Sequence, residues 1–201
     1  MKIQILGVAR TGTTNLALSI EKEGYTTILE PYGVNPKKNK TALVEKLCVK
    51  NISNQFPIDK FKSAYDFQLE NIPTFDKTIL LDRKNELEHW KSYLNLLKKY
   101  HKDPKTTHTI WYEDDITSDW DRKMRNDGFY EVFKLQKETI KKLSNEFKIP
   151  ITYYEDLFSE DRMYSFETIN KWDLDIDPFN VNEYLDPSKR YKQIGKRSQF
   201  I

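Results

Sequence analysis

The sequence predicts an α/β protein of three layers, α/β/α, in which helices cover both faces of a mostly parallel sheet. Short apolar runs typical of buried strands alternate along the chain with longer segments whose apolar residues recur at helical spacing. A glycine-containing loop over residues 7–14 joins the first such run to the first helical segment. With 201 residues the chain is long enough for one sizeable core, so we expect a single domain over residues 1–201.

In the first half of the chain, residues 2–6 form a short β-branched and apolar run, and residues 14–20 carry apolar side chains at helical spacing. We then expect a strand over 26–29, a basic loop with a proline, and a short helix over 41–48. Further strands are expected over 61–67 and 78–81.

In the second half, residues 86–100 show a helical apolar stripe, and residues 101–126 fit no regular pattern, so we expect an irregular insertion there. A long helix is predicted over 130–147, a strand over 151–154 and a further helix over 158–172. In the long helix the side chains expected to point inward are Val132, Leu135, Ile140 and Leu143.

The loop over residues 7–14 has the glycine spacing of a nucleotide phosphate loop, with Gly7 and Gly12 in place, but Thr13 stands where the lysine would be. In the ordinary loop that lysine neutralises the terminal phosphates, while main-chain N–H groups wrap them. A loop without it is poorly equipped to activate a γ-phosphoryl group. Arg10, three residues earlier, supplies a cation suited to the bridging oxygen of a shorter 5′-phosphate donor.

The alternative is a threonine-rich helix cap after a glycine turn, which needs no ligand. We favour an anion site because the glycines, the arginine and the flanking strand and helix agree with each other. A helix N-terminus offers N–H groups without internal partners and a dipole that favours negative charge.

This segment resembles a known family. Residues Arg10-Thr11-Gly12-Thr13-Thr14 are similar to the Arg-Ser-Gly-Thr-Thr loop of sulfotransferases, which use 3′-phosphoadenosine 5′-phosphosulfate (PAPS) as donor and release the diphosphate PAP. The resemblance, to members of bacterial or viral type, implies a P-loop sulfotransferase-like fold. It also implies that these residues and Asn15 bind the donor, without a metal.

Residues 78–92 resemble the strand, turn and helix whose arginine and serine hold the donor's 3′-phosphate in that family. The family spacing of about eight residues between the basic residue and the serine pairs Lys84 with Ser92, and Arg83 stays a candidate beside Lys84. A weaker similarity is Tyr154-Glu155-Asp156-Leu157, like a Tyr-Glu-Asp-Leu segment after a late strand of many sulfotransferases.

The region from about 186 to 201 is the most basic of the chain. Sulfotransferases often clasp the 3′-phosphate with a late basic loop that contains glycine. By this resemblance Lys192, Gly195, Lys196 and Arg197 are candidates, with a solvated tail as the alternative.

Glu30 is the candidate general base. Many bacterial and polysaccharide-modifying members of the family use a glutamate placed soon after the loop helix, and Glu30 ends the strand predicted over 26–29. Residues at the carboxyl ends of parallel strands face the ligand crevice. Pro31 biases Glu30 toward an extended backbone, so its side chain is expected to project from that edge. The alternative is an acid paired with a surface lysine.

Other residues point to no further chemistry. His101 and His108, with acids at 113–115, have no recognised metal-ligand spacing, so we expect no metal. A net charge of +2 gives no reason to expect nucleic-acid binding. The single Cys48 cannot form an internal disulfide, and neither a signal peptide nor a membrane span is visible, so we expect a cytoplasmic protein without a membrane partner.

The resemblance therefore implies a sulfotransferase that moves a sulfuryl group to a hydroxyl or amine of a small-molecule or glycan acceptor. The sequence carries no signal for which acceptor this is, or for the oligomeric state. Two alternatives remain: a small-molecule kinase that uses ATP, and a non-catalytic member of the fold that binds a nucleotide.

Overall fold

The computed structural model describes residues 1–31, 46–102, 117–157 and 165–174, and the structural statements that follow refer to these residues. The fold is α/β. Within the described chain, five strands form one all-parallel sheet in the order β2-β3-β1-β4-β5. The strands are β1 (Lys2–Gly7), β2 (Thr26–Leu29), β3 (Leu47–Ile52), β4 (Lys77–Asp82) and β5 (Ile151–Tyr153).

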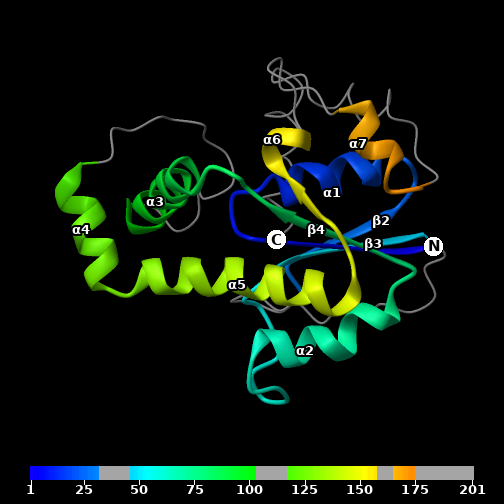
Figure 1. Ribbon diagram of the computed structural model, residues 1–201, viewed down its shortest axis with the longest axis horizontal. Coiled ribbons are helices and arrows are strands. Elements are labelled where there is room, and N and C mark those ends of the chain that lie inside the picture. Colours follow the sequence, from blue (N-terminus) through cyan, green and yellow to red (C-terminus); the bar gives the residue numbers. More distant parts are fainter. Residues whose placement is uncertain (32–45, 103–116, 158–164, 175–201) are drawn as a thin grey trace.

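Helices cover both faces of the sheet, which gives the three layers expected (Figure 1). One face carries α1 (Thr13–Glu21), α6 (Tyr154–Leu157) and α7 (Phe166–Asn170), and the other carries α2 (Ala64–Asn71), the 3-10 turn η1 (Ile72–Thr74) and α5 (Phe129–Phe147). Two more helices, α3 (Glu86–Lys102) and α4 (Ser118–Asn126), lie beside the amino-terminal part of α5.

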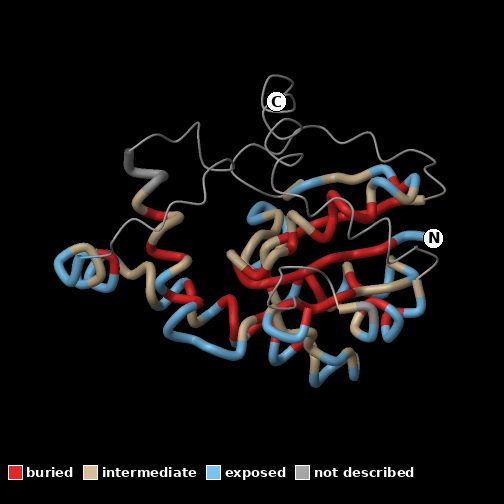
Figure 2. The backbone as a smooth tube through the Cα atoms, turned by 90° about the horizontal axis from the view of Figure 1, so that it is seen from above, coloured by how far each residue is buried: buried red, intermediate tan, exposed pale blue. Residues whose placement is uncertain are grey.

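Each face of the sheet has its own apolar core. Five of the six residues of β1 are buried, as expected for a parallel strand covered on both sides, and Figure 2 shows the central strands as the buried middle of the molecule. Ile5 packs with Leu16 of α1 and Trp172 on one face. Leu6 packs with Trp90 of α3 and Phe133 of α5 on the other.

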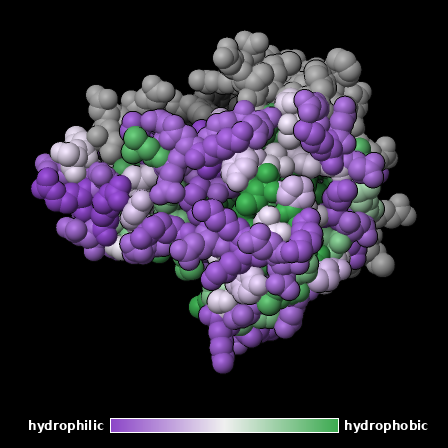
Figure 3. Space-filling model, in the orientation of Figure 1, coloured by the Kyte–Doolittle hydropathy of each residue, from purple (hydrophilic) through white to green (hydrophobic). Residues whose placement is uncertain are grey.

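The outer surface is strongly polar. In the face seen in Figure 3, hydrophilic side chains dominate and hydrophobic ones gather only in small patches. This agrees with a chain in which 32% of the residues are charged. Among the described helices, none combines the length and the apolar character that crossing a bilayer requires.

Several predicted elements are confirmed. The strands expected over 2–6, 26–29, 78–81 and 151–154, and the helices expected over 14–20, 86–100 and 130–147, match observed elements to within two residues at each end.

Three expectations in the first half and middle of the chain differ from the structure where it describes these residues. Residues 61–67 are no strand, because α2 begins at Ala64, and Ser63 caps it by accepting the N–H of Asp66. Residues 47 and 48 lie in β3 and residue 46 is a bend, while residues 41–45 of the helix expected over 41–48 fall outside the described residues. The insertion expected over 101–126 contains α4, and its residues 103–116 are not described.

The long helix α5 turns a different face inward than expected. Ile140 and Leu143 are buried as predicted, but Val132 is 37% exposed and Leu135 54% exposed. Phe133 takes their place in the core. The helix expected over 158–172 is observed only as α7, and residues 158–164 are not described.

Candidate functional site

The candidate site lies at the carboxyl ends of the strands, where the strand order changes direction. The central strand β1 has β3 on one side and β4 on the other. The segments that leave β1 and β4 therefore diverge at this edge, which is where open α/β sheets bind ligands. The loop over residues 7–14, called the glycine loop below, follows β1, and Arg83 follows β4.

The two glycines of the glycine loop are required for different reasons. A Cβ on Gly7 would lie 2.5 Å from Cγ2 of Thr13 and 2.8 Å from Oγ1 of Thr11, so no side chain fits there. Gly12 has φ 82° and is the N-cap of α1. Arg10 has φ 73°, a left-handed conformation that costs an L-residue about 1–2 kcal/mol. Such outliers cluster at ligand-binding positions.

The glycine loop presents a group of main-chain donors. Within the described chain, the N–H groups of residues 11–14 donate no hydrogen bond, and they surround the N-terminus of α1. The Thr11 hydroxyl donates to the carbonyl of Val8 at 2.7 Å, and the Thr13 side chain is 3% exposed. Thr14 and Asn15 are only half-buried. The loop therefore offers N–H groups and the Thr14 hydroxyl to an anion.

Arg10 lies beside Ser92. Its Nε donates to the hydroxyl oxygen of Ser92 at 3.2 Å, although 82 residues separate them in the chain. Burial and the nearby charge of Arg83 lower the pKa of Arg10, while Tyr154 acts in the opposite direction. Two guanidinium groups that repel each other in a partly buried place favour the binding of an anion between them.

Arg83 is held by the segment after β5. Its guanidinium lies over the ring of Tyr154, 4.1 Å from the centroid. Its Nε is buried and has no hydrogen-bond acceptor among the described residues. Directly before it, Asp82 accepts the N–H of Arg83 at 2.8 Å and the ammonium of Lys137 at 2.6 Å. Arg83 is thus fixed in place with a donor still unsatisfied.

Lys84 is turned elsewhere. Its ammonium pairs with Asp156 at 2.5 Å, and its side chain is 54% exposed. The side chain of Glu155 accepts the N–H groups of Lys84 and Asn85, and so caps the start of α3. Of the two basic candidates, the structure therefore brings Arg83, and not Lys84, close to Arg10. Each residue of the Tyr154-Glu155-Asp156 segment also contacts the turn after β4.

Glu30 ends β2 at the same edge of the sheet, but its surroundings differ from the expectation. Its φ is 50°, so the extended backbone expected before Pro31 is wrong. Its Oε1 pairs with the ammonium of Lys50, and its Oε2 accepts from Nε2 of Gln55 at 3.1 Å. Lys50 is no surface lysine: its side chain is 2% exposed, and burial lowers its pKa while Glu30 acts against that shift.

Sequence reasoning missed four residues that shape this edge. A buried position for Lys50 was not predicted, because the β3 strand was not predicted. Gln136 and His89 contact the main chain of Ala9, and Lys137 pairs with the buried Asp82. These contacts join residues that lie 55 to 127 positions apart, so no local pattern indicates them.

The remaining candidates are not placed. Lys192, Gly195, Lys196 and Arg197 lie outside the described residues, as does His108. In the described ranges, no cluster of three or more histidine, cysteine, aspartate or glutamate side chains suits a metal ion.

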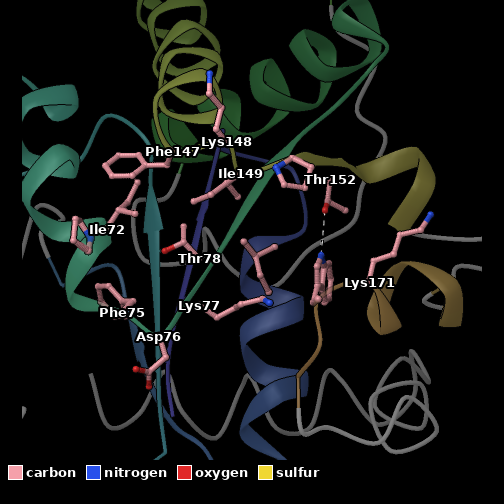
Figure 4. A pocket seen from close by; sticks show the side chains of 14 residues that line it. Ile72, Phe75, Asp76, Lys77, Thr78, Phe147, Lys148, Ile149, Thr152 and Lys171 are labelled. Carbon is pink, nitrogen blue, oxygen red and sulfur yellow. Dashed lines mark hydrogen bonds between the residues drawn. The ribbon is translucent and has the colours of Figure 1, made fainter.

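A pocket of about 410 Å³ lies at the other edge of the sheet (Figure 4). It is lined by the first residues of β4, by the end of α5 and by Trp172, whose indole N–H donates to Thr152 at 3.2 Å. Because these residues precede or begin their strands, the pocket is remote from the glycine loop. It is therefore separate from the candidate site.

Searches against protein-family models, curated proteins and solved structures found no match to this chain.

Proposed function

We propose that the protein is a sulfotransferase that uses PAPS, with a P-loop sulfotransferase-like fold. The observation that carries the proposal is the position of Arg10 in the glycine loop, beside Ser92 and Arg83 and directly before residues 11–14, whose N–H groups donate no hydrogen bond within the described chain. Two loops that are far apart in the sequence and resemble the two donor-binding motifs of one family are neighbours here.

In this proposal the donor lies along the carboxyl edge of β1 and β4. The N–H groups of the glycine loop and the Thr14 hydroxyl hold the 5′-phosphosulfate end. Arg83 and Ser92 hold the 3′-phosphate. The Ser92 hydroxyl accepts from Arg10, so its own proton remains free to be donated to a phosphate oxygen. Lys84, paired with Asp156, takes no part.

Arg10 supplies the main catalytic effect. The acceptor oxygen forms the new bond to sulfur while the bond from sulfur to the bridging oxygen breaks, and that electron pair stays on the 5′-phosphate of PAP. The transition state is loose, by analogy with phosphoryl transfer, so charge develops on the bridging oxygen. Fixed donors aimed at such a charge usually contribute the largest catalytic term.

Glu30 takes the proton of the acceptor. The strand order β2-β3-β1 separates the end of β2 from the end of β1 by two strand spacings, about 10 Å. The sulfuryl group must therefore lie over the end of β3 for Glu30 to reach the attacking hydroxyl or amine. The contact with Lys50 fixes the direction of the Glu30 carboxylate.

That contact is the observation that favours a second candidate, a non-catalytic member of the fold that binds a nucleotide. A carboxylate whose two oxygens are both engaged needs no catalytic role. The kinase alternative is weakened because Thr13, at the position of the lysine, is buried and packs against Gly7.

The test has two parts. Calorimetry with PAP, and separately with ATP and magnesium, should give binding for PAP alone. PAP release from PAPS, measured with a panel of phenols, sugars and amines, should then be lowered about 100- to 1000-fold by Arg10→Ala. Glu30→Gln should slow release and leave PAP binding unchanged. Binding of PAP without release with any acceptor would favour the non-catalytic candidate, and no binding would refute the proposal.

A further inference from the structure

We propose that His89 and Gln136 are positioning residues, which hold both main-chain polar groups of Ala9 and thereby aim the Arg10 guanidinium at the anion. The identity of that anion as PAPS rests on the proposed function. The positioning itself rests on contacts of the glycine loop and holds for any anion bound there.

Ala9 is held by two helices that are remote in the sequence. Its N–H donates to Oε1 of Gln136 in α5 at 2.8 Å, across 127 residues. Its carbonyl accepts from Nε2 of His89 in α3, also at 2.8 Å, across 80 residues. The preceding residue, Val8, still donates to Leu81 as a continuation of the sheet. At Ala9, the hydrogen-bond partners of the main chain thus change from a neighbouring strand to the side chains of two helices.

The next residue is Arg10, whose left-handed backbone needs support from its surroundings. The contacts of Ala9 fix the chain just before it. The hydrogen bond from the Thr11 hydroxyl to the Val8 carbonyl closes the turn around it. On α3, His89 and Ser92 are three residues apart and so lie on one helix face, where the first holds Ala9 and the second accepts from Arg10. One face of α3 therefore holds both the main chain before Arg10 and the side chain of Arg10.

Both positioning residues are themselves fixed. Gln136 is 2% exposed, its carbonyl accepts from the Ser53 hydroxyl at 3.0 Å, and its side chain also interacts with Tyr93. His89 is fully buried and meets the ring of Phe133 edge-on, with 4.9 Å between centroids.

The tautomer of His89 follows from its surroundings. Burial lowers the pKa of His89 to about 3, so the ring is neutral near pH 7. Because the Ala9 carbonyl can only accept, the single ring proton is on Nε2. His89 therefore acts as a neutral hydrogen-bond donor, a role that an amide N–H of similar reach can take over.

The experiment compares His89→Leu, which removes the donor, with His89→Gln, which keeps an amide N–H. Ile140→Val is the matched control, because Ile140 is buried in the same apolar cluster as His89's neighbour Phe133 and its side chain makes no hydrogen bond to the glycine loop. For each variant we would measure unfolding by urea, the dissociation constants of PAP and of inorganic sulfate, and the NMR signal of the Arg10 Nε–H group.

We expect His89→Leu to bind both anions about tenfold more weakly, because a buried carbonyl loses its donor and the loop loses its support. His89→Gln should stay within about threefold of the unmodified protein, and Ile140→Val should lose stability without losing affinity. A shifted Arg10 Nε–H signal should accompany the weak binding in His89→Leu only.

Unchanged affinity in His89→Leu, or equal losses in His89→Leu and His89→Gln, would overturn the positioning role. If His89→Leu does not fold, Gln136→Met, which removes the acceptor of the Ala9 N–H without adding a charge, should weaken the binding of both anions, and unchanged affinity in it would overturn the positioning role. A protein that binds sulfate with the expected pattern of variants but never binds PAP would refute the proposed donor and leave the positioning role standing. Binding of neither anion to the unmodified protein would overturn both.

Discussion

At the scale of single residues, the candidate site contains basic side chains that differ in how far they are buried. Arg10 and Arg83 lie near each other at the edge of the sheet, whereas Lys84 points to Asp156 and solvent. Lys50 is buried and is paired with Glu30. Sequence spacing favoured Lys84 over Arg83 as the partner of Ser92. In the structure, the side chain of Lys84 leaves the turn after β4 toward Asp156, whereas Arg83 lies near Arg10.

The first prediction at this scale separates the two basic neighbours. Arg83→Ala should weaken PAP binding about 10- to 100-fold, because it removes a charge-assisted hydrogen bond to the 3′-phosphate. Lys84→Ala should change it by less than about threefold, since its surface ion pair is worth little. Calorimetry on both variants checks this, and a larger loss in Lys84→Ala would contradict the placement of the 3′-phosphate beside Arg83.

A second prediction concerns the Lys50–Glu30 pair. Glu30→Gln should lower the free energy of unfolding at pH 7 by about 1–3 kcal/mol, less than for a fully buried pair because the Glu30 side chain is 32% exposed. The folded-state pKa of Lys50 is already lowered by burial, and loss of Glu30 lowers it further. At a pH between the folded-state pKa and the unfolded-state pKa of Lys50, the unfolded state binds more protons than the folded state. The free energy of unfolding therefore rises with pH in that range.

The deficit of Glu30→Gln should therefore shrink as the pH rises through the lowered folded-state pKa of Lys50, above which Lys50 is neutral in the folded state with or without Glu30. Urea unfolding at pH 7 and at pH 9.5 measures this. Glu167→Gln, which breaks an exposed pair with Lys171, is the control and should have little effect at either pH. A deficit in Glu30→Gln that does not vary with pH would contradict the burial of a charged Lys50.

At the scale of elements, the sequence predicted those with a clear period or apolar run and missed those shaped by distant partners. The β3 strand, Leu-Cys-Val-Lys-Asn-Ile, is buried along most of its length but carries two polar residues, and Lys50 is tolerated there only because Glu30 pairs with it. The strand, glycine loop and helix at the start of the chain were predictable because their signals lie in consecutive residues. The support of the glycine loop from α3 and α5 was not, because His89 and Gln136 look like ordinary helix residues in the sequence.

The helices that were missed had local signals of a different kind. Ser63 and Thr117 each accept the N–H group three residues later, which is the usual N-cap arrangement.

In α5, Gln136 and Lys137 are buried while Leu135 is exposed, because the helix directs polar side chains to the glycine loop and Asp82. Hydrophobic periodicity alone therefore assigned the wrong inward face.

The prediction at this scale uses Cys48 as a reporter of β3. Its thiol is buried, and burial raises its pKa to about 12. At pH 8 the folded protein should react with a thiol-specific disulfide reagent only when β3 opens, so labelling should be slow and should accelerate with unfolding in urea. Rapid labelling of the folded protein would contradict a central position of β3 between β1 and β2.

At the scale of the whole molecule, one sheet separates two apolar cores and carries the candidate site at its carboxyl edge. The pocket lined by Trp172 lies at the opposite edge. A ligand at the carboxyl edge contacts segments after β1 and β4 together with α3. Such a ligand should therefore stabilise the whole domain against unfolding, and not a single helix or strand.

The prediction that follows is a concentration-dependent melting temperature. PAP at 100 times its dissociation constant should add about 2.7 kcal/mol to the free energy of unfolding. For a protein of this size that corresponds to a rise of about 5–10 °C. Thermal unfolding with PAP, and with ATP and magnesium as the comparison, measures it, and an equal rise with both would favour a general nucleotide site over a PAPS site.

The all-parallel pairing also bears on how the protein is made. Among the described strands no two neighbours are joined by a hairpin, because every pair is parallel, and β5 adds to the edge only near residue 151. Contacts between remote segments form slowly, because closing the intervening chain costs entropy before the contact is gained. During synthesis the ribosome releases the glycine loop first, yet Gln136 emerges more than a hundred residues later. The nascent chain thus completes the support of the proposed anion site only after α5 has emerged.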